Sequence, residues 1–375
     1  MTSAHDLDAL SRAVLAHNRR GRGRRRPRGS AAALACELPA PPPPGSSNGR
    51  AWLDASPRRP CPVCGSDSWC QTARDGATVL CKRVESGRAR VNRGGVEFHV
   101  HHLADGGVRA ARTARVEPLP PSRVRADEDT RDRAYRAVLA ALRLDADDRE
   151  ALLARGLSPE DLTANGYRSL PLEGRARLAH VIVEAVGEER AREVPGVVRR
   201  ERDGRAWLAF AGSPGVIIPC RDTSGRIVAL KVRRRDPCEG PRYLYITSAR
   251  DGGASAACAL HMPVRARAML DASQGSARVV VTEGELKADV SSALLGVPVL
   301  SIPGVGSWRL ALDAARALRP AVVSVALDAD PAGARAAVVL VDALRAEGMR
   351  AEHWRWDRRF KGLDDWCAAR RRGEV

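Results

Sequence analysis

The chain has 375 residues, enough for two or three domains, and a formal net charge of +17, which favours acidic partners, with nucleic acid before anionic membrane. No stretch approaches the roughly 18 uninterrupted apolar residues of a membrane span, and the arginine-rich N-terminus lacks the apolar segment of a secretion signal. We therefore expect a cytoplasmic protein with no membrane partner. Nine cysteines in a reducing compartment favour a metal site over a disulfide framework.

Residues 1–50 are predicted to form a disordered, basic and proline-rich tail. An arginine run is followed there by an alanine stretch and by the prolines Pro41 to Pro44. Such a segment cannot bury enough surface to offset the entropy lost on ordering. Its charge could hold phosphates non-specifically or could simply be solvated.

Residues 51–105 are predicted to form a small zinc ribbon. Cys61 and Cys64 make a C-x-x-C pair, and Cys70 and Cys81 follow at a longer spacing. Four thiolates suit tetrahedral Zn²⁺, and a module of this size needs such a staple to fold. A redox pair would instead need a surrounding βαβ unit, which the sequence lacks. The long spacing leaves three histidines open as a substitute ligand: His99, His101 and His102.

A linker at 106–129 precedes an α+β segment at 130–272. Apolar residues at helical spacing predict a helix from about Thr130: Tyr135, Val138, Leu139 and Leu142. Ser158 and Asp161 are predicted to form a capping box around Pro159. Strand-like runs at 215–222 and 226–233 are joined by a turn at 223–225, which predicts a hairpin, and a third run follows at 243–247.

The last segment, residues 273–375, alternates buried strands with helices. Apolar runs predict strands at 278–282, 297–301, 321–327 and 349–354, and amphipathic stretches predict helices at 286–295, 310–318 and 333–347. Continuous apolar strands that alternate with helices indicate a parallel sheet covered on both faces. The fold class is therefore α/β, with this parallel-sheet domain at the C-terminus.

Acidic residues follow two of these strands directly. Glu283 comes after the first strand, and Asp328 and Asp330 come after the third. Ligands bind outside the carboxyl ends of the strands in open α/β sheets, and hard carboxylate oxygens suit Mg²⁺ or Mn²⁺. Such a metal could polarise a phosphoryl oxygen and activate a hydroxyl. The alternative is that these carboxylates only cap the helices that follow.

The segments 282–289 and 328–333 resemble the Toprim domain shared by primases, topoisomerases, some nucleases and RecR recombination proteins. The resemblance implies a metal-dependent catalytic site on Glu283, Asp328 and Asp330, in which Glu283 could also act as general acid or base.

The segment 361–365 resembles the lysine-acid stretch near the end of phage primase-helicase Toprim domains. It implies further metal ligands at Asp364 and Asp365 and a nucleotide contact at Lys361. Lys287 could contact phosphate or form a surface ion pair.

The segment before the parallel sheet shows which of the Toprim-containing families this sequence resembles. Residues 155–160 with 166–167, and then 218–222, 225–228 and 241–244, resemble in order and spacing the polymerase domain of bacterial replicative primases. The resemblance implies a basic face for template and nucleotide phosphates, made by Arg221, Lys231, Arg233 and Arg242. Taken alone, these hairpin residues would be structural.

The sequence thus favours a DNA primase-like, Mg²⁺-dependent nucleotidyltransferase. It would act on single-stranded DNA with nucleoside triphosphates in plasmid or phage replication, with a separate helicase as a candidate partner. One alternative is a Toprim nuclease that uses water as nucleophile. Another is a non-catalytic single-stranded DNA-binding protein resembling RecR, which also places a zinc motif before a Toprim domain.

Overall fold

The computed structural model describes residues 52–55, 59–65, 70–84, 86, 88–91, 97–103, 123–235, 241–273 and 277–375. The predicted tail and most of the predicted linker lie outside the described residues. Within these ranges no helix is long and apolar enough to cross a membrane. The described chain contains three sheets and a separate two-stranded hairpin.

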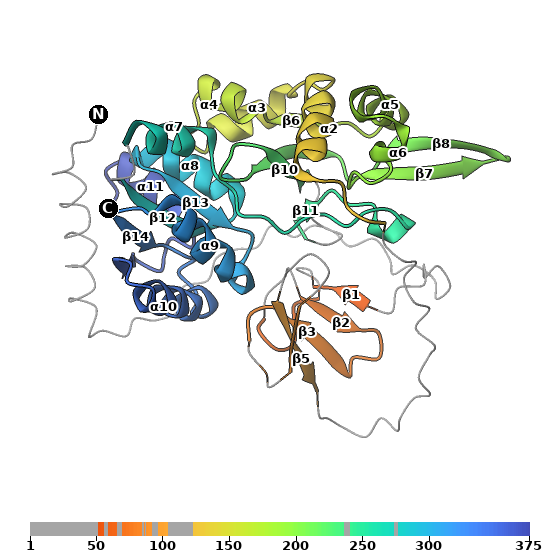
Figure 1. Ribbon diagram of the computed structural model, residues 1–375. Coiled ribbons are helices and arrows are strands. Elements are labelled where there is room, and N and C mark those ends of the chain that lie inside the picture. Colours follow the sequence, from red (N-terminus) through yellow and green to blue (C-terminus); the bar gives the residue numbers. More distant parts are fainter. Residues whose placement is uncertain are drawn as a thin grey trace.

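The N-terminal part of the described chain is a sheet (Figure 1), and we call it, together with the four clustered cysteines on its strands and loops, the cysteine module. Its five antiparallel strands are β1 (Trp52–Asp54), β2 (Gln71–Ala73), β3 (Thr78–Cys81), β4 (Ala89–Val91) and β5 (Glu97–His102). They are ordered β1-β2-β3-β5-β4. The strands are short, so a metal is the natural means of holding the module together.

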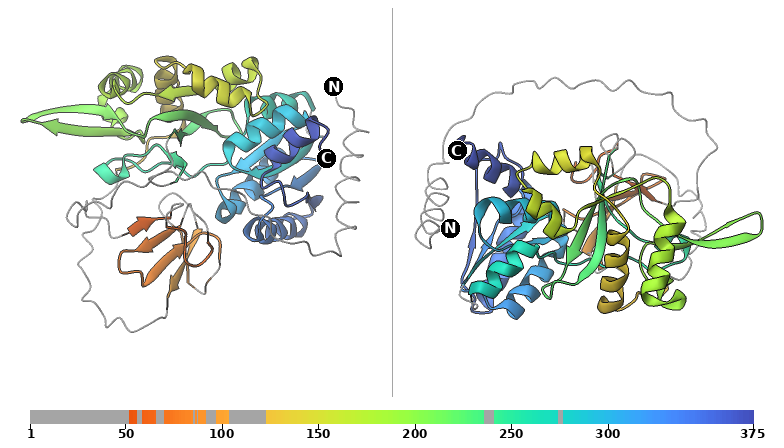
Figure 2. Two further views of the ribbon diagram at one scale, coloured as in Figure 1. Left: turned by 180° about the vertical axis from the view of Figure 1, so that it is seen from behind. Right: turned by 90° about the horizontal axis from the view of Figure 1, so that it is seen from above.

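The middle subdomain combines helices with the antiparallel sheet β11-β10-β9-β6. Its helices are α2 (Glu128–Ala140), α3 (Ala146–Leu153), α4 (Pro159–Asn165), α5 (Arg175–Val186), α6 (Glu188–Ala191) and the 3-10 turn η1 (Ala249–Asp251). Its strands are β6 (Arg168–Leu170), β7 (Val197–Arg202), β8 (Arg205–Phe210), β9 (Gly215–Arg221), β10 (Ile227–Arg234) and β11 (Tyr243–Tyr245). The β7–β8 hairpin projects away from the rest of the subdomain (Figures 1 and 2).

Local signals in the sequence predicted this subdomain correctly where they were strong. The helix expected from about Thr130 is α2, and Tyr135 and Val138 are buried on its inner face. The capping box is present: the Ser158 hydroxyl accepts a hydrogen bond from the Asp161 N–H at 3.1 Å, and the Asp161 carboxylate accepts one from the Ser158 N–H at 3.0 Å. The predicted hairpin is β9–β10.

The C-terminal domain is the predicted parallel sheet, and we call it the parallel-sheet domain. Its strands are β12 (Arg278–Glu283), β13 (Val299–Ile302), β14 (Val322–Val325) and β15 (Ala351–His353), in the order β13-β12-β14-β15. All neighbouring pairs are parallel. Its helices are α7 (Val264–Ser273), α8 (Glu285–Leu295), η2 (Val305–Ser307), α9 (Trp308–Leu318), α10 (Pro331–Ala346) and α11 (Leu363–Arg371).

Helices cover both faces of this sheet, because its strands are apolar on both sides. Val279 and Val281 of β12 pack in one core cluster with residues of α9 and α10. Val280, which points to the other face, packs in a second cluster with residues of α8 and α11. The expected α/β class and covered parallel sheet are thus confirmed.

Buried polar groups join the middle subdomain to the parallel-sheet domain. Lys231 of β10 is 1% exposed and pairs at 2.6 Å with Glu285, the first residue of α8. Nearby, Tyr167 and His261 both hydrogen-bond the buried carboxylate of Asp289 in α8. These contacts fix α8, and with it the end of β12, against the antiparallel sheet.

The Lys231→Met variant is expected to lose about 3–5 kcal/mol of folding free energy, because it leaves the Glu285 carboxylate buried without its partner. Adding Glu285→Gln should recover most of that loss. Urea denaturation followed by circular dichroism measures both. Arg242→Met removes an exposed cation from the same subdomain and should change stability by less than about 0.5 kcal/mol. Equal losses of folding free energy in the Lys231 and Arg242 variants would contradict the role of Lys231 as the buried partner of Glu285.

Candidate functional site

The predicted acidic residues meet where the order of the parallel strands reverses. From β12 the chain passes through α8 to β13 on one side, and from β14 it passes through α10 to β15 on the other. β12 and β14 are neighbours, so their carboxyl ends open a crevice of the kind in which α/β proteins bind ligands. Glu283 ends β12, and Asp328 lies three residues beyond the end of β14.

Two glycines lie beside Glu283 in this crevice. Gly284 has φ +91°, a conformation that L side chains rarely adopt, and it turns the chain from β12 into α8. Gly304, in the loop after β13, would carry a Cβ 3.9 Å from Glu283 Oε1. The Glu283 side chain therefore extends toward the loop that leads into η2.

The carboxylates share this crevice with a lysine. Lys287, in the first turn of α8, donates a hydrogen bond to Asp328 Oδ1. Burial raises the pKa of Glu283 to about 7, and the charge of Asp328 adds to the effect while Lys287 and Arg83 oppose it. Burial also raises the pKa of Asp328, against the pull of Lys287. Negative charge is thus crowded at this point, a condition that a bound cation would relieve.

Asp330 has a structural partner as well. It is the N-cap of α10, and its Oδ1 accepts a hydrogen bond from the Gly333 N–H at 2.8 Å. The capping alternative therefore holds for this residue, whose second carboxylate oxygen is not used in that bond. Gly333 is buried against the preceding loop, and a Cβ there would lie 2.2 Å from the backbone oxygen of Asp328.

Gly333→Ala is expected to displace the 328–330 loop, because a contact of 2.2 Å with a backbone oxygen can be relieved only if the backbone moves. We expect a stability loss of about 1–3 kcal/mol together with weaker binding of divalent metal. Thermal unfolding and Mn²⁺ titration measure the two effects. Ala334→Ser, at the next and exposed residue, is the matched control and should change neither. Wild-type metal binding by Gly333→Ala would contradict the expectation.

The donor set fits a hard divalent metal, although it is not gathered tightly. Among the described residues, the four cysteines are the group of three or more candidate ligands whose donor atoms all lie within 4.8 Å of one another. The three carboxylates therefore do not form an equally close cluster. Their oxygens still suit Mg²⁺ or Mn²⁺, which retains several waters and needs only one or two protein carboxylates.

The expected lysine-acid segment lies beside this crevice, but its acids have other partners. The backbone oxygen of Lys361 accepts a hydrogen bond from the Ala329 N–H at 2.8 Å, so the two segments are adjacent. Asp364 is buried in an ion pair with Arg155 of the middle subdomain. Asp365 is exposed and accepts a weak bond from the Gly362 N–H at 3.4 Å. Their geometry is that of an ion pair and a helix cap.

The four cysteines of the module are brought together as a metal site requires. Cys64 and Cys70 sulfurs lie 3.7 Å apart, and Cys70 and Cys81 sulfurs 3.9 Å apart. Four ligands at ~2.3 Å from a tetrahedral zinc lie about 3.8 Å from one another, so these thiols fit Zn²⁺. The hydrogen bond between Cys70 and Cys81 lowers the pKa of Cys81 and raises the pKa of Cys70, so Cys81 is the thiol of this pair that ionises first.

The long sequence gap between Cys70 and Cys81 is closed by a hairpin. Gln71 pairs with Leu80 across β2 and β3, which sets the flanking cysteines opposite each other. No histidine belongs to the cluster formed by the described residues. His99 accepts a hydrogen bond from the Ser86 N–H at 3.2 Å, and His101 Nε2 lies 2.9 Å from the Val84 oxygen. The alternative of a histidine ligand is therefore not supported.

The expected basic face is corrected at two residues. Arg221 is 7% exposed and Lys231 is 1% exposed, because α8 packs against this sheet. Arg233 is half-buried, and Arg242 is exposed. The buried pair cannot form part of an open surface for a strand of nucleic acid.

Two features escaped the sequence analysis. The β7–β8 hairpin carries four exposed arginines and the exposed Trp207, and the Asp203-Gly204 pair, a favoured two-residue hairpin turn, was the signal that could have found it. Lys82 and Arg83 of the cysteine module line a small cavity with Glu283. Nothing in the sequence placed these two cations beside an acid two hundred residues away.

No family model and no curated protein sequence matches the chain. Among solved structures, the Aquifex aeolicus primase, determined as its zinc-binding and RNA polymerase domains, matches with a TM-score of 0.51 and 15% identity over 66% of this chain and 60% of that chain. The RNA polymerase domain of Mycobacterium tuberculosis primase DnaG, in complex with double-stranded DNA, matches with a TM-score of 0.50 and 18% identity over 65% of this chain and 79% of that chain.

These matches identify the structural class: the chain has the fold of a bacterial primase catalytic core, as the resemblance in its sequence predicted. It spans 60% of the Aquifex aeolicus chain in that structure. The identities of 15% and 18% make this a likeness of fold.

Proposed function

We propose that the protein is a DNA primase-like nucleotidyltransferase that uses a divalent metal and acts on single-stranded DNA. The observation that carries the proposal is the position of Glu283, Asp328 and Asp330 at the strand-order reversal of a primase-type parallel sheet. The Aquifex aeolicus and Mycobacterium tuberculosis proteins of like fold are primases. The proposal extends to a role in plasmid or phage replication beside a separate helicase.

The residues of the crevice have distinct roles in this proposal. Glu283 and Asp328 supply carboxylate oxygens for Mg²⁺ or Mn²⁺, and Asp330 supplies its oxygen that is not used in helix capping. The bound metal would polarise the reacting phosphoryl group. Lys287 and Lys361 add positive charge beside Asp328, which suits contact with the phosphates of a nucleotide. Asp364 positions the 361–365 segment through Arg155.

The cysteine module is proposed to hold Zn²⁺ on Cys61, Cys64, Cys70 and Cys81 as a structural ion. All four thiols are committed to the cluster, so no ligand position is left open for a reaction at the metal. The module then serves as a rigid platform beside the parallel-sheet domain, where a template strand and a nucleotide must meet.

The β7–β8 hairpin is proposed as the contact for single-stranded DNA that the buried cations Arg221 and Lys231 do not provide. Arg200 pairs with Trp207 across the two strands, and Arg202 pairs with Arg205, so these four side chains share one face. Arg200 also forms an ion pair with Asp251 at its base. Arginines for phosphates beside an exposed ring for bases are the features of a single-strand platform.

Trp207→Ala is expected to weaken single-stranded DNA binding by about fivefold to 100-fold, the effect of losing one stacked base. Fluorescence anisotropy with a labelled oligonucleotide at fixed salt measures it. Trp207→Phe keeps an aromatic ring and should retain most of the affinity. Leu172→Ala removes another exposed apolar side chain, 74% exposed, and should have no effect. Unchanged affinity in Trp207→Ala would remove the hairpin from the DNA-binding surface.

The activity is tested by incubating the purified protein with single-stranded DNA, Mg²⁺ or Mn²⁺ and labelled ribo- or deoxyribonucleoside triphosphates, beside Asp328→Ala. Short new oligomers made by the wild type alone support the proposal. Shortening of the template without nucleotides would instead identify a nuclease. Binding without turnover, unaffected by Asp328→Ala, would identify a non-catalytic DNA-binding protein.

A further inference from the structure

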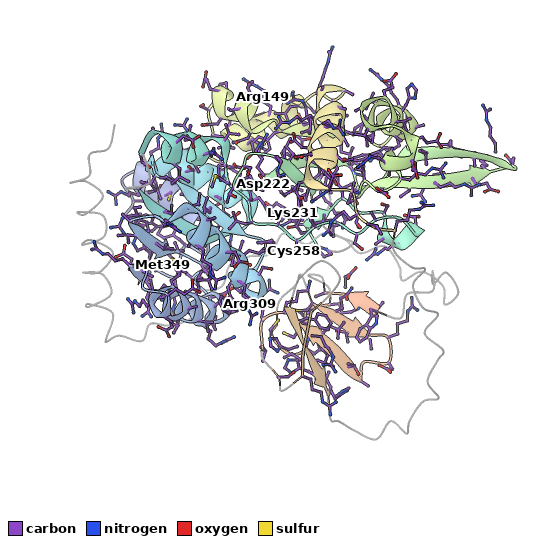
Figure 3. All side chains as sticks on the ribbon, viewed as in Figure 1. Arg149, Asp222, Lys231, Cys258, Arg309 and Met349 are labelled. Carbon is purple, nitrogen blue, oxygen red and sulfur yellow. The ribbon has the colours of Figure 1, made fainter. Side chains whose placement is uncertain are left out.

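A basic cleft lies between the cysteine module and the parallel-sheet domain. It has a volume of about 230 Å³, and its polar lining comes from both sides: the cations Lys82 and Arg83, with His99, from the module, and the cations Arg309 and Arg335 from α9 and α10. Arg309 lies at the edge of the parallel-sheet domain that faces the module (Figure 3). None of the described residues that line this cleft is acidic.

Specific contacts hold the two walls of the cleft together. The Arg335 guanidinium donates a hydrogen bond to the backbone oxygen of Arg83 at 3.1 Å, and β5 of the module contacts η2. On the other side of the module, the Arg250 guanidinium lies 3.4 Å from the Asp54 carboxylate. The module is thus docked on both of the other parts of the chain, and the cleft is formed within one molecule.

The cleft adjoins the acidic crevice. Lys82, Arg83 and Gly306 line the basic cleft and also a smaller cavity of about 20 Å³ that contains Glu283. A ligand in the basic cleft would therefore extend toward Glu283, one of the carboxylates proposed to bind metal. Positive charge on one side of Glu283 and acid on the other is the arrangement expected where a metal-bound phosphate chain lies.

We propose that this cleft binds the polyphosphate chain of a nucleoside triphosphate, so that the cysteine module completes the nucleotide site of its own chain. The inference rests on the proposed function and names the substrate group and the residues that hold it. Arginine forks bind phosphate oxygens in pairs, and Lys82 adds a compact charge. A volume of about 230 Å³ is below the ~300–1,000 Å³ of pockets that enclose a whole drug-sized ligand, so the base would lie outside the cleft.

A DNA strand is the other source of phosphate that this cleft could meet. A strand carries one charge for each nucleotide along its length, whereas a triphosphate concentrates its charge in one place. Four cationic side chains that converge on one cavity next to Glu283 match the concentrated charge better. Binding of DNA in the cleft is accordingly an outcome that would overturn the proposal.

The test compares Arg309→Ala/Arg335→Ala with the matched double variant Arg358→Ala/Arg371→Ala, in the full chain loaded with zinc. All four arginines are exposed residues of the same domain, and both double variants remove the same charge. Two titrations are run: a labelled adenosine triphosphate analogue with a β,γ-methylene bridge, competed by inorganic tripolyphosphate, and a labelled single-stranded oligonucleotide. Arg83→Gln is measured beside them, with its zinc content as the check on the module's fold.

We expect Arg309→Ala/Arg335→Ala to weaken binding of the analogue and of tripolyphosphate at least tenfold, with DNA affinity changed less than twofold. Arg83→Gln, at full zinc content, should weaken triphosphate binding as well, and the control pair should change neither. Loss of DNA affinity alone, or no change in either titration, overturns the cleft assignment. If Arg83→Gln binds triphosphate normally, the module does not belong to the site.

The titrations need no turnover, so they separate this inference from the proposed activity. If the protein binds triphosphate through the cleft but makes no primers, the cleft assignment holds and the proposed primase activity is wrong. If the protein makes primers but its triphosphate binding does not depend on Arg309 and Arg335, the primase activity holds and the cleft assignment is wrong.

Discussion

Asp328→Asn should reduce metal-dependent nucleotide incorporation at least about 100-fold, since even a group that only orients a metal ligand is worth about 10–100-fold. Asparagine keeps the size of the buried side chain but removes the charge that attracts the metal and pairs with Lys287. Incorporation of labelled nucleotide into short oligomers, followed over time, measures the loss.

The control for this variant must show that lost incorporation does not come from unfolding. Asp342→Asn changes an exposed carboxylate of α10 in the same way and should leave incorporation at the wild-type level. Circular dichroism and thermal unfolding should show that both variants remain folded. Nucleotide incorporation by Asp328→Asn at more than about a tenth of the wild-type rate would exclude this residue as a metal ligand.

The second large effect is expected at the cysteine cluster. Cys81→Ser should abolish stoichiometric zinc binding and unfold the module, because structural zinc supplies about 10–16 kcal/mol to small zinc-folded peptides. Cys81 is central to the cluster, since its sulfur lies 3.9 Å from that of Cys70 and accepts backbone N–H groups of Arg83 and Val84. Zinc analysis and limited proteolysis measure the two consequences.

Proteolysis should then cut within residues 52–103 and spare the core at 123–375. Treatment of the wild type with a strong chelator should reproduce the pattern. Cys258→Ser is the matched control: it lies outside the module, where a serine can keep the hydrogen bond to Ser307, and it should retain one zinc per chain. A protease-resistant module in zinc-free Cys81→Ser would show that the metal is not what holds it.

Zinc loss also bears on the basic cleft. Lys82 and Arg83 directly follow Cys81, so the metal fixes the backbone from which both cations extend. If the cleft binds triphosphate as proposed, Cys81→Ser will lose that affinity together with its zinc, whereas Asp328→Asn will keep the contribution made by the cleft.

The sequence by itself determined the elements of the parallel-sheet domain and the edge of the sheet at which its acidic residues lie. Continuous apolar strands alternating with helices specified a parallel sheet, and the position of Glu283 and Asp328 just after two strands specified the edge at which they lie. These are local properties: the periodicity of side chains within each element, and the rule that parallel strands end on one side. The capping box at Ser158 was equally local.

Only the tertiary structure decided which distant residues meet. Packing of α8 against the antiparallel sheet buried Arg221 and Lys231, which the sequence analysis assigned to an open face. The β2–β3 hairpin joined Cys70 to Cys81, and docking of the module brought Arg83 to Glu283. A charged side chain has the same local signature on a surface, in a buried ion pair or in a cleft, so its environment depends on long-range packing that no local pattern encodes.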